Sequence, residues 1–152
     1  MAVVSNSSPL IALEQIGQLE LLRELYRAIL IPEAVSNEIA ESVAPRDWLQ
    51  TRSVTAPVPL ETQRSAIGPG EREAIGLALQ VQAAAILLDD DPARRLAIQL
   101  GLPVIGTAGI LLIAKERKLI PAVKPHLDAL LAKRFFLGSQ TYKLILEKAG
   151  EV

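Results

Sequence analysis

Short apolar runs separated by longer amphipathic segments extend along most of this chain. Uninterrupted short runs of this kind are typical of buried strands. They lie at residues 2–5, 29–31, 85–88 and 103–105. Between the runs, apolar residues recur every three or four positions, as Leu10, Leu13 and Ile16 do, which predicts helices with one buried face. The expected helices span residues 8–16, 18–26, 32–41, 71–82 and 91–101, with further helices towards the C-terminus. Alternating strands and helices predict an α/β fold with a parallel sheet.

Proline, glycine and serine positions predict where several of these elements begin. Ser8 precedes Pro9 and is expected to be the N-cap of the first helix, and Asp91 before Pro92 is expected to cap the helix that follows it. The sequence Gly-Pro-Gly at 68–70 predicts a loop. A short helix is expected around Trp48 and a strand near residues 53–55.

Composition narrows the class of protein. A chain of 152 residues fits one domain, and 50% apolar with only 3% aromatic residues implies a core of Leu, Ile, Val and Ala. The chain contains no cysteine, which excludes disulfides, thiolate zinc sites and a cysteine nucleophile and is compatible with the cytoplasm, where we expect the protein. The first residues lack a basic segment followed by a long apolar one, so no signal peptide is expected. No apolar run approaches the length of about 18 residues that a membrane span needs.

The balance of charge limits how the protein can meet nucleic acid. The formal net charge is −1, whereas proteins that bind nucleic acid generally carry a basic excess. Contact with a nucleic acid would therefore depend on local patches and on a bound metal ion.

Polar oxygen ligands follow two of the apolar runs. Asn6 comes after the run at 2–5, and Asp89 and Asp90 come after the run at 85–88. In open parallel sheets the ligand crevice lies at the carboxyl ends of the strands, and a hard cation such as Mg²⁺ prefers oxygen ligands. Asn6 would equally suit a bond to the backbone of the turn.

Three glutamates lie near the apolar stripes of two predicted helices. Glu38 is spaced to share a face with Val35, where it would either bind a metal or reach water from the edge of the stripe. Glu71 lies one turn before the stripe of the helix 71–82, whereas Glu73 points roughly the other way. Both could also serve only to complement the helix dipole.

Other residues are candidates for contacts with phosphate. Ser8 is expected mainly to cap the first helix and only secondarily to bind a ligand. Arg94 and Arg95 would either hold phosphate or form ion pairs with the aspartates. Other chemistries are poorly supported, because His126 is the sole histidine and no zinc motif, phosphate-binding loop or dinucleotide-binding glycine motif occurs.

Five segments together resemble the PIN-domain proteins, and specifically a prokaryotic subgroup similar to VapC-type toxins. The segments are residues 4–11, residues 31–35 with Glu38, residues 70–75, residues 88–90 with 94–97, and residues 101–107. Their order and spacing extend the resemblance to about residue 150. The resemblance implies a single PIN-like domain over residues 1–152, with a three-layer fold whose central parallel sheet has about four to five strands wrapped by helices.

The resemblance also implies an activity and partners. Such proteins hold Mg²⁺ or Mn²⁺ with acidic residues, cut RNA, often form homodimers and are commonly encoded beside a small antitoxin. By position, Asn6 replaces the family's first aspartate and Glu38 matches the acid of the third helix. Glu71 or Glu73 matches the acid of the middle helix, and Asp89 with Asp90 matches the acid after the following strand. We expect Glu38, Glu71 and Asp89 to be the catalytic ligands, with Asp90 and Asn6 as second-line or water-mediated contacts.

Asn6 leaves a second hypothesis open. An aspartate at this position would add a full charge, and Asn6 adds none, which should weaken metal binding. The chain would then be a PIN-like module that binds RNA or protein without cutting. A phospho-receiver or phosphatase-like domain ranks last, because those folds place an acidic nucleophile after the first strand.

Overall fold

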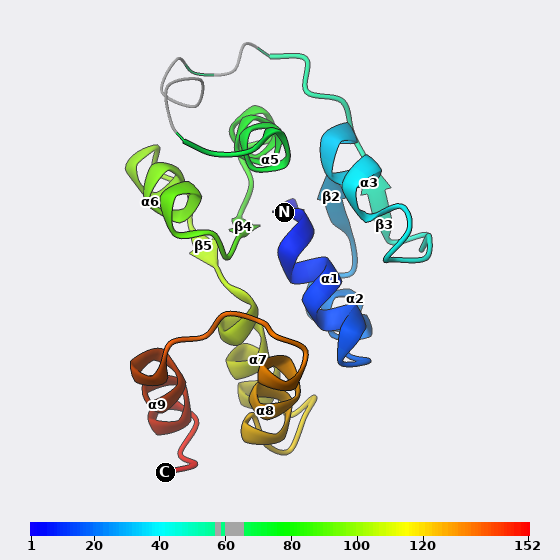
Figure 1. The fold of residues 1–152 in the computed structure, drawn as a ribbon. Helices are drawn as coiled ribbons and strands as arrows, with labels where there is room; N and C mark the ends of the chain where they lie inside the picture. Colours follow the sequence, from blue (N-terminus) through cyan, green and yellow to red (C-terminus); the bar gives the residue numbers. More distant parts are fainter. Residues whose placement is uncertain (57–58, 60–65) are drawn as a thin grey trace.

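The protein is described by a computed structural model that covers residues 1–56, 59 and 66–152. Its centre is a five-stranded sheet in which every described pairing is parallel, with the strand order β3-β2-β1-β4-β5 (Figure 1). The strands are β1 (Val3–Ser5), β2 (Ile29–Ile31), β3 (Leu49–Thr51), β4 (Ala85–Leu87) and β5 (Val104–Ile105). The predicted α/β fold with a parallel sheet is confirmed.

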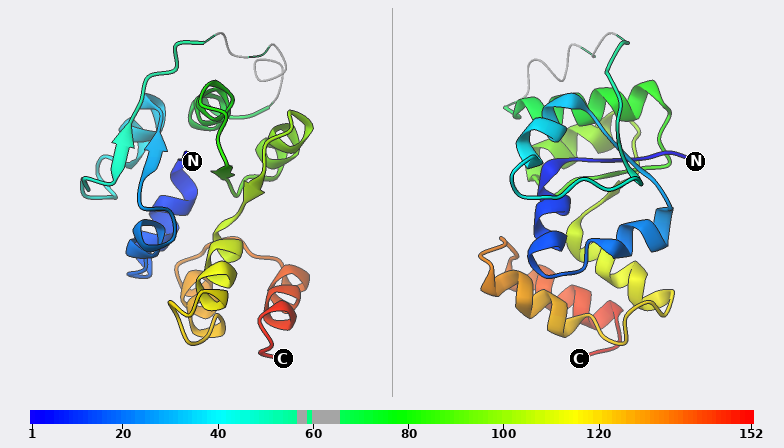
Figure 2. Two further views of the ribbon diagram at one scale, coloured as in Figure 1. Left: turned by 180° about the vertical axis from the view of Figure 1, so that it is seen from behind. Right: turned by 90° about the vertical axis from the view of Figure 1, so that its right-hand side faces the viewer.

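Helices cover both faces of the sheet and extend beyond it. They are α1 (Ser7–Gln15), α2 (Glu20–Tyr26), α3 (Glu33–Ile39), α5 (Pro69–Gln80), α6 (Asp91–Gln99), α7 (Thr107–Glu116), α8 (Lys124–Ala132) and α9 (Ser139–Lys148). Figure 2 shows α5 and α6 at one end of the molecule and α7, α8 and α9 at the other. None of the described helices has the length and apolar character that crossing a bilayer requires.

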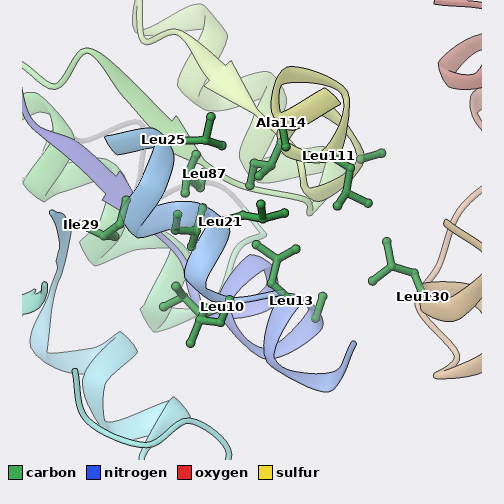
Figure 3. Close-up of a cluster of buried hydrophobic side chains, with 14 of the residues drawn as sticks. Leu10, Leu13, Leu21, Leu25, Ile29, Leu87, Leu111, Ala114 and Leu130 are labelled. Atoms are coloured by element: carbon green, nitrogen blue, oxygen red, sulfur yellow. The ribbon is translucent and has the colours of Figure 1, made fainter. Parts of the chain in front are cut away.

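Alternate residues of the strands feed two separate cores. Ile29 and Leu87 pack with helices α1, α2 and α7, and Figure 3 shows them beside the leucines of these helices. Val4, Leu30 and Ile86 point to the other face and pack with α5 and α6. The alternation follows from the two-residue period of a strand, so β1, β2 and β4 are apolar on both sides.

The order of the strands reverses direction beside β1. The chain moves outward from β1 through β2 to β3, and then returns to lay β4 and β5 on the other side of β1. The N–H of Asn6 donates to the carbonyl oxygen of Leu87 at 3.0 Å, which holds the carboxyl ends of β1 and β4 together. Open α/β sheets bind their ligands at such a reversal.

Several predicted boundaries are wrong, each for a local reason. Residues 53–55 are not a strand, since Leu49–Thr51 pairs with β2 instead, and Trp48 lies buried in a turn rather than in a helix. Helix α1 begins at Ser7 with Asn6 as its N-cap, so Ser8 lies inside the helix. Asp90, not Asp91, caps α6, because its carboxylate accepts the N–H of Ala93 at 3.1 Å.

One further boundary differs from the prediction at the start of the middle helix. The Gly-Pro-Gly sequence at 68–70 was expected to be entirely loop, but α5 already begins at Pro69 with Gly68 as its N-cap. Proline is well suited to the first turn, where its missing N–H leaves no bond unmade. Glu71 and Gly70 therefore both lie in the first turn of α5.

Glu151 ties the C-terminal helices together. Its carboxylate accepts the N–H groups of Val123 at 2.7 Å and Lys124 at 2.9 Å, at the start of α8, and the ammonium of Lys115 at 2.9 Å. Burial alone would raise the pKa of this carboxyl, but the two N–H groups and Lys115 outweigh burial and lower the pKa to about 2. These hydrogen bonds therefore favour the ionised carboxylate of Glu151 in the folded protein.

Glu151→Gln should lower the free energy of unfolding at neutral pH by about 2 kcal/mol, because bonds to a charged acceptor are lost. A lowered folded-state pKa means that the contribution is complete above the ordinary value of 4.5 and fades as pH falls towards about 2. Urea unfolding of both proteins at several pH values measures this. A difference between wild type and variant that persists unchanged at pH 2 would contradict the assignment.

Candidate functional site

A cavity of about 820 Å³ opens at the carboxyl ends of β1 and β4. Its walls come from α1, α3, α5, the start of α6 and the segment between α8 and α9. The lining residues are Asn6, Ser7, Ser8, Ile11, Glu38, Glu71, Asp89, Asp90, Asp91, Pro92, Arg134, Phe135 and Phe136. The cavity therefore lies where the sheet reverses its strand order, and five carboxylates are distributed along its lining.

Asp89 is the most firmly held acid of the cavity. One carboxylate oxygen accepts the N–H of Thr107 at 2.8 Å, and the other accepts the hydroxyls of Thr107 at 2.7 Å and Ser8 at 3.0 Å. Thr107 is the first residue of α7, so Asp89 also occupies the anion-binding end of that helix. Three donors from two helices fix the orientation of this carboxylate.

Glu38 is held from the opposite side of the cavity. The hydroxyl of Ser7 donates to its carboxylate, which lies against Gly70 in the first turn of α5. A Cβ atom at Gly70 would stand only 2.2 Å from Oε1 of Glu38, so the absence of a side chain at position 70 makes room for the carboxylate. Adjacent hydroxyls of α1, from Ser7 and Ser8, thus position the two acids.

Asn6 presents an unused acceptor in the wall of the cavity. The residue is only 4% exposed, and it occupies the N-cap of α1 without making a side-chain cap bond. Within the described residues, its Oδ1 has no hydrogen-bond partner. Asn6 lines the cavity, and buried side-chain oxygens are normally satisfied, so its unpaired oxygen calls for an external donor or a cation.

The structure separates Glu71 from Glu73. Glu71 is partly buried and lines the cavity, with its carboxylate folded back towards Gly68. Glu73 instead accepts the N–H of Ala34 at 3.1 Å, at the start of α3, and does not line the cavity. The two candidates of the middle helix therefore have different surroundings.

The remaining sequence candidates lie at the rim or outside. Asp90 and Asp91 line the cavity but are exposed, and Asp90 is occupied as the cap of α6. Arg94 donates to the carbonyl oxygen of Leu88 at 2.8 Å and lines a second cavity of about 550 Å³, which adjoins Asp89. Arg95 is exposed and lines neither of the two.

The donor set suits a hard divalent cation. Among residues 1–56, 59 and 66–152, no three acidic or histidine side chains lie close enough together to hold a metal ion by themselves. Mg²⁺, however, is commonly held by one or two carboxylates together with several waters. Glu38, Asp89 and the unpaired Oδ1 of Asn6 offer oxygen ligands of that kind in a single cavity.

Sequence reasoning assigned no role to Ser7, Thr107, Arg134 or Phe136. Ser7 and Thr107 lie in segments that resemble the PIN-domain proteins, but the carboxylates that they contact are far away in the sequence, so the segments alone do not reveal this role. Arg134 and Phe136 could have been noticed, since the segment Lys133 to Phe136 contains both phenylalanines of a chain that is only 3% aromatic.

Comparison with known proteins agrees with this architecture. The family model DUF3368, described as a PIN domain, matches residues 2–151. Neither a curated protein nor a solved structure matches the chain. PIN domains are commonly nucleases that act with divalent metals. Because the match extends over nearly every residue, the chain belongs to the PIN-domain family.

Proposed function

We propose that this protein is a metal-dependent ribonuclease that hydrolyses phosphodiester bonds of RNA. The observation that carries the proposal is the unpaired, buried Oδ1 of Asn6 in the same cavity as the positioned carboxylates of Glu38 and Asp89. Family membership supports nuclease-type chemistry in general.

Each side chain has a distinct part in the proposed reaction. Glu38, Asp89 and Asn6 would hold Mg²⁺ or Mn²⁺, which supplies polarisation of the phosphodiester and lowers the pKa of bound water. Ser7, Ser8 and Thr107 keep the two carboxylates in place by hydrogen bonds, so little reorganisation is needed during reaction.

Glu71, which the resemblance led us to expect as a metal ligand, is proposed here as the proton acceptor instead. No hydrogen bond to its carboxylate is found within the described residues, so it is free to take a proton from the attacking water. The water oxygen forms a new bond to phosphorus, one ester P–O bond breaks, and the departing oxygen takes a proton from solvent. Asp90 and Asp91 at the rim would contact water rather than the ion.

We further propose, from the resemblance to VapC-type proteins, that the protein is the cytoplasmic toxin of a toxin–antitoxin pair and forms a homodimer. Five carboxylates line the cavity, so a basic side chain of a small antitoxin would fit there by charge. Such a side chain would block access of both metal and RNA.

A non-catalytic role in binding RNA or protein is the alternative. It is favoured by Asn6 in place of an aspartate and by the lack of three clustered acids in the described parts of the chain. Titration of the purified protein with Mn²⁺ by calorimetry, together with incubation of an RNA pool in Mn²⁺ or EDTA, separates the two. A bound ion with cleavage abolished by EDTA supports the nuclease, whereas neither binding nor cleavage supports the alternative.

Asn6→Asp should strengthen Mn²⁺ binding by about tenfold, because it adds a full charge to the ligand set. Without metal the same change should lower the melting temperature, since an unpaired charge would be buried there. Calorimetry and thermal melting with and without Mn²⁺ measure both effects. A variant that binds metal no better and melts as the wild type does would show that Asn6 is not part of a cation site.

Glu71→Gln should reduce cleavage by about a hundredfold, whereas Glu73→Gln should leave the rate within about threefold of wild type. The reason is that Glu71 lines the cavity and Glu73 is bonded to Ala34 in α3. Rates on one RNA substrate under saturating Mn²⁺ provide the measurement. Equal losses in the two variants would contradict the distinction.

A further inference from the structure

The segment that joins α8 to α9, residues 133–138, combines two uncommon features. It carries both phenylalanines of a chain that has few aromatic residues. One of them, Phe136, is 88% exposed, whereas large apolar side chains are usually buried. Phe135 differs, because it is partly buried and packs against the core beside the helices. Phe135 therefore anchors the segment, while the ring of Phe136 is free to contact another molecule.

The segment lies beside the acidic cavity. Arg134, Phe135 and Phe136 line the same cavity as Glu38 and Asp89, and the two phenylalanines also line the adjoining one. Figure 1 shows the connection from α8 to α9 on the side of these helices that faces the sheet. The exposed ring is thus placed at the entrance to the proposed site of cleavage.

Arg134 has an unfavourable backbone conformation for its residue type. Its φ is +65°, and the N–H groups of Arg134 and Phe135 donate to Leu131 and Leu130, at 3.0 Å each, in the pattern that ends many helices. Glycine is the residue preferred at this position. The guanidinium makes no hydrogen bond or ion pair with any described residue.

Arg134 also has an electrostatic setting that suits a phosphate. Among the described residues that line the cavity, it is the one basic residue beside five carboxylates. RNA that enters this cavity brings further negative charge, which the carboxylates repel. An unpaired guanidinium at the rim would attract the phosphate next to the bond being cut.

We propose that Phe136 and Arg134 form a subsite for one unpaired nucleotide of the RNA substrate. Phe136 stacks on the base and Arg134 contacts the neighbouring phosphate. The subsite rests on the proposed function, since it positions RNA for cleavage. Bases inside a duplex are already stacked on both sides, so the subsite selects single-stranded RNA over a duplex.

The first test measures binding with a short single-stranded RNA that contains 2-aminopurine, whose fluorescence falls on stacking. The Glu38→Gln/Asp89→Asn protein is used with Mn²⁺, so that the RNA stays intact. Phe136→Leu in this background should weaken binding by about tenfold and remove the loss of fluorescence, while Phe136→Trp should restore both. Equal binding and quenching by the leucine variant, or equal affinity for a duplex of the same sequence, would overturn the subsite.

Arg134→Gly offers a variant that should fold at least as well as wild type, because glycine suits the backbone at φ +65°. We expect weaker RNA binding and a slope of log affinity against log salt that is smaller by about one. Arg27→Gly is the matched control, since Arg27 is also exposed with φ +68° but lies just before β2 and lines neither of the two cavities. The same loss in both variants would overturn the role of Arg134.

Cleavage kinetics distinguish failure of the subsite from failure of the proposed function. In the otherwise wild-type protein, Phe136→Leu should raise KM with little change in kcat. If the wild type cuts RNA and Phe136→Leu leaves KM unchanged, the subsite is wrong and the nuclease stands. If RNA binds in a Phe136-dependent way but is never cut, the nuclease is wrong and the subsite stands. No binding of RNA at all would overturn both.

Discussion

Asp89→Asn should reduce metal-dependent RNA cleavage by about a hundredfold or more, the largest loss that we expect from a single substitution. The change removes the charge of a proposed metal ligand and hardly changes its shape. The amide oxygen can still accept the N–H of Thr107, and the amide nitrogen can donate to the hydroxyls of Thr107 and Ser8, because a hydroxyl both donates and accepts. The fold should therefore survive the loss of the charge.

The measurement is the initial rate of RNA cleavage in Mn²⁺, with thermal melting to establish that the variant is folded. Asp47→Asn is the matched control, since Asp47 is an exposed aspartate just before β3, at the opposite edge of the sheet. It should cleave as the wild type does. Full activity in a folded Asp89→Asn protein would remove Asp89 from the ligand set.

Gly70→Ala should lower the rate of RNA cleavage without lowering the stability of the folded protein. The new Cβ would stand 2.2 Å from Oε1 and 2.9 Å from Oε2 of Glu38, so the carboxylate must move away and lose its bond to Ser7. Displacement of a ligand by about an ångström lowers a rate by about a hundredfold. Meanwhile alanine is favoured over glycine in a helix by about 1 kcal/mol, which offsets the cost of moving a flexible side chain.

A double-mutant cycle tests this explanation. In a Glu38→Ala background, Gly70→Ala should have no further effect on cleavage or metal affinity, because the displaced group is already gone. The melting temperature should rise in that background. An equal loss of activity from Gly70→Ala whether or not Glu38 is present would show that the alanine acts on something else.

The sequence was sufficient to predict four of the five strands, β1, β2, β4 and β5, and to predict that polar residues gather at the carboxyl ends of two of them. Residues 29–31 form a strand as expected, and the strand expected at 85–88 forms over 85–87, because a short apolar run bounded by turn residues has few other ways to be buried. Asn6 and Asp89 meet since both follow strands that are neighbours in a parallel sheet. Their roles as ligands stay predictions.

Other features depend on contacts that no local pattern records. The strand at Leu49–Thr51 was missed because it is an edge strand, half-buried or exposed along its length, with no apolar periodicity to mark it. The bond from Ser7 to Glu38 spans 31 residues and that from Ser8 to Asp89 spans 81, so only the fold reveals them. The position of Phe136 beside the cavity likewise follows from how α8 and α9 pack.

The strand order has a consequence for synthesis of the protein on the ribosome. β1 can pair with β2 early, but its other neighbour, β4, begins at Ala85, and the donors that orient Asp89 come from Thr107. Chains emerge from the N-terminus onward, so a nascent chain shorter than this lacks an assembled centre. If the protein cuts RNA as we propose, the nascent chain would thereby be inactive towards the message and the ribosome that are still making it.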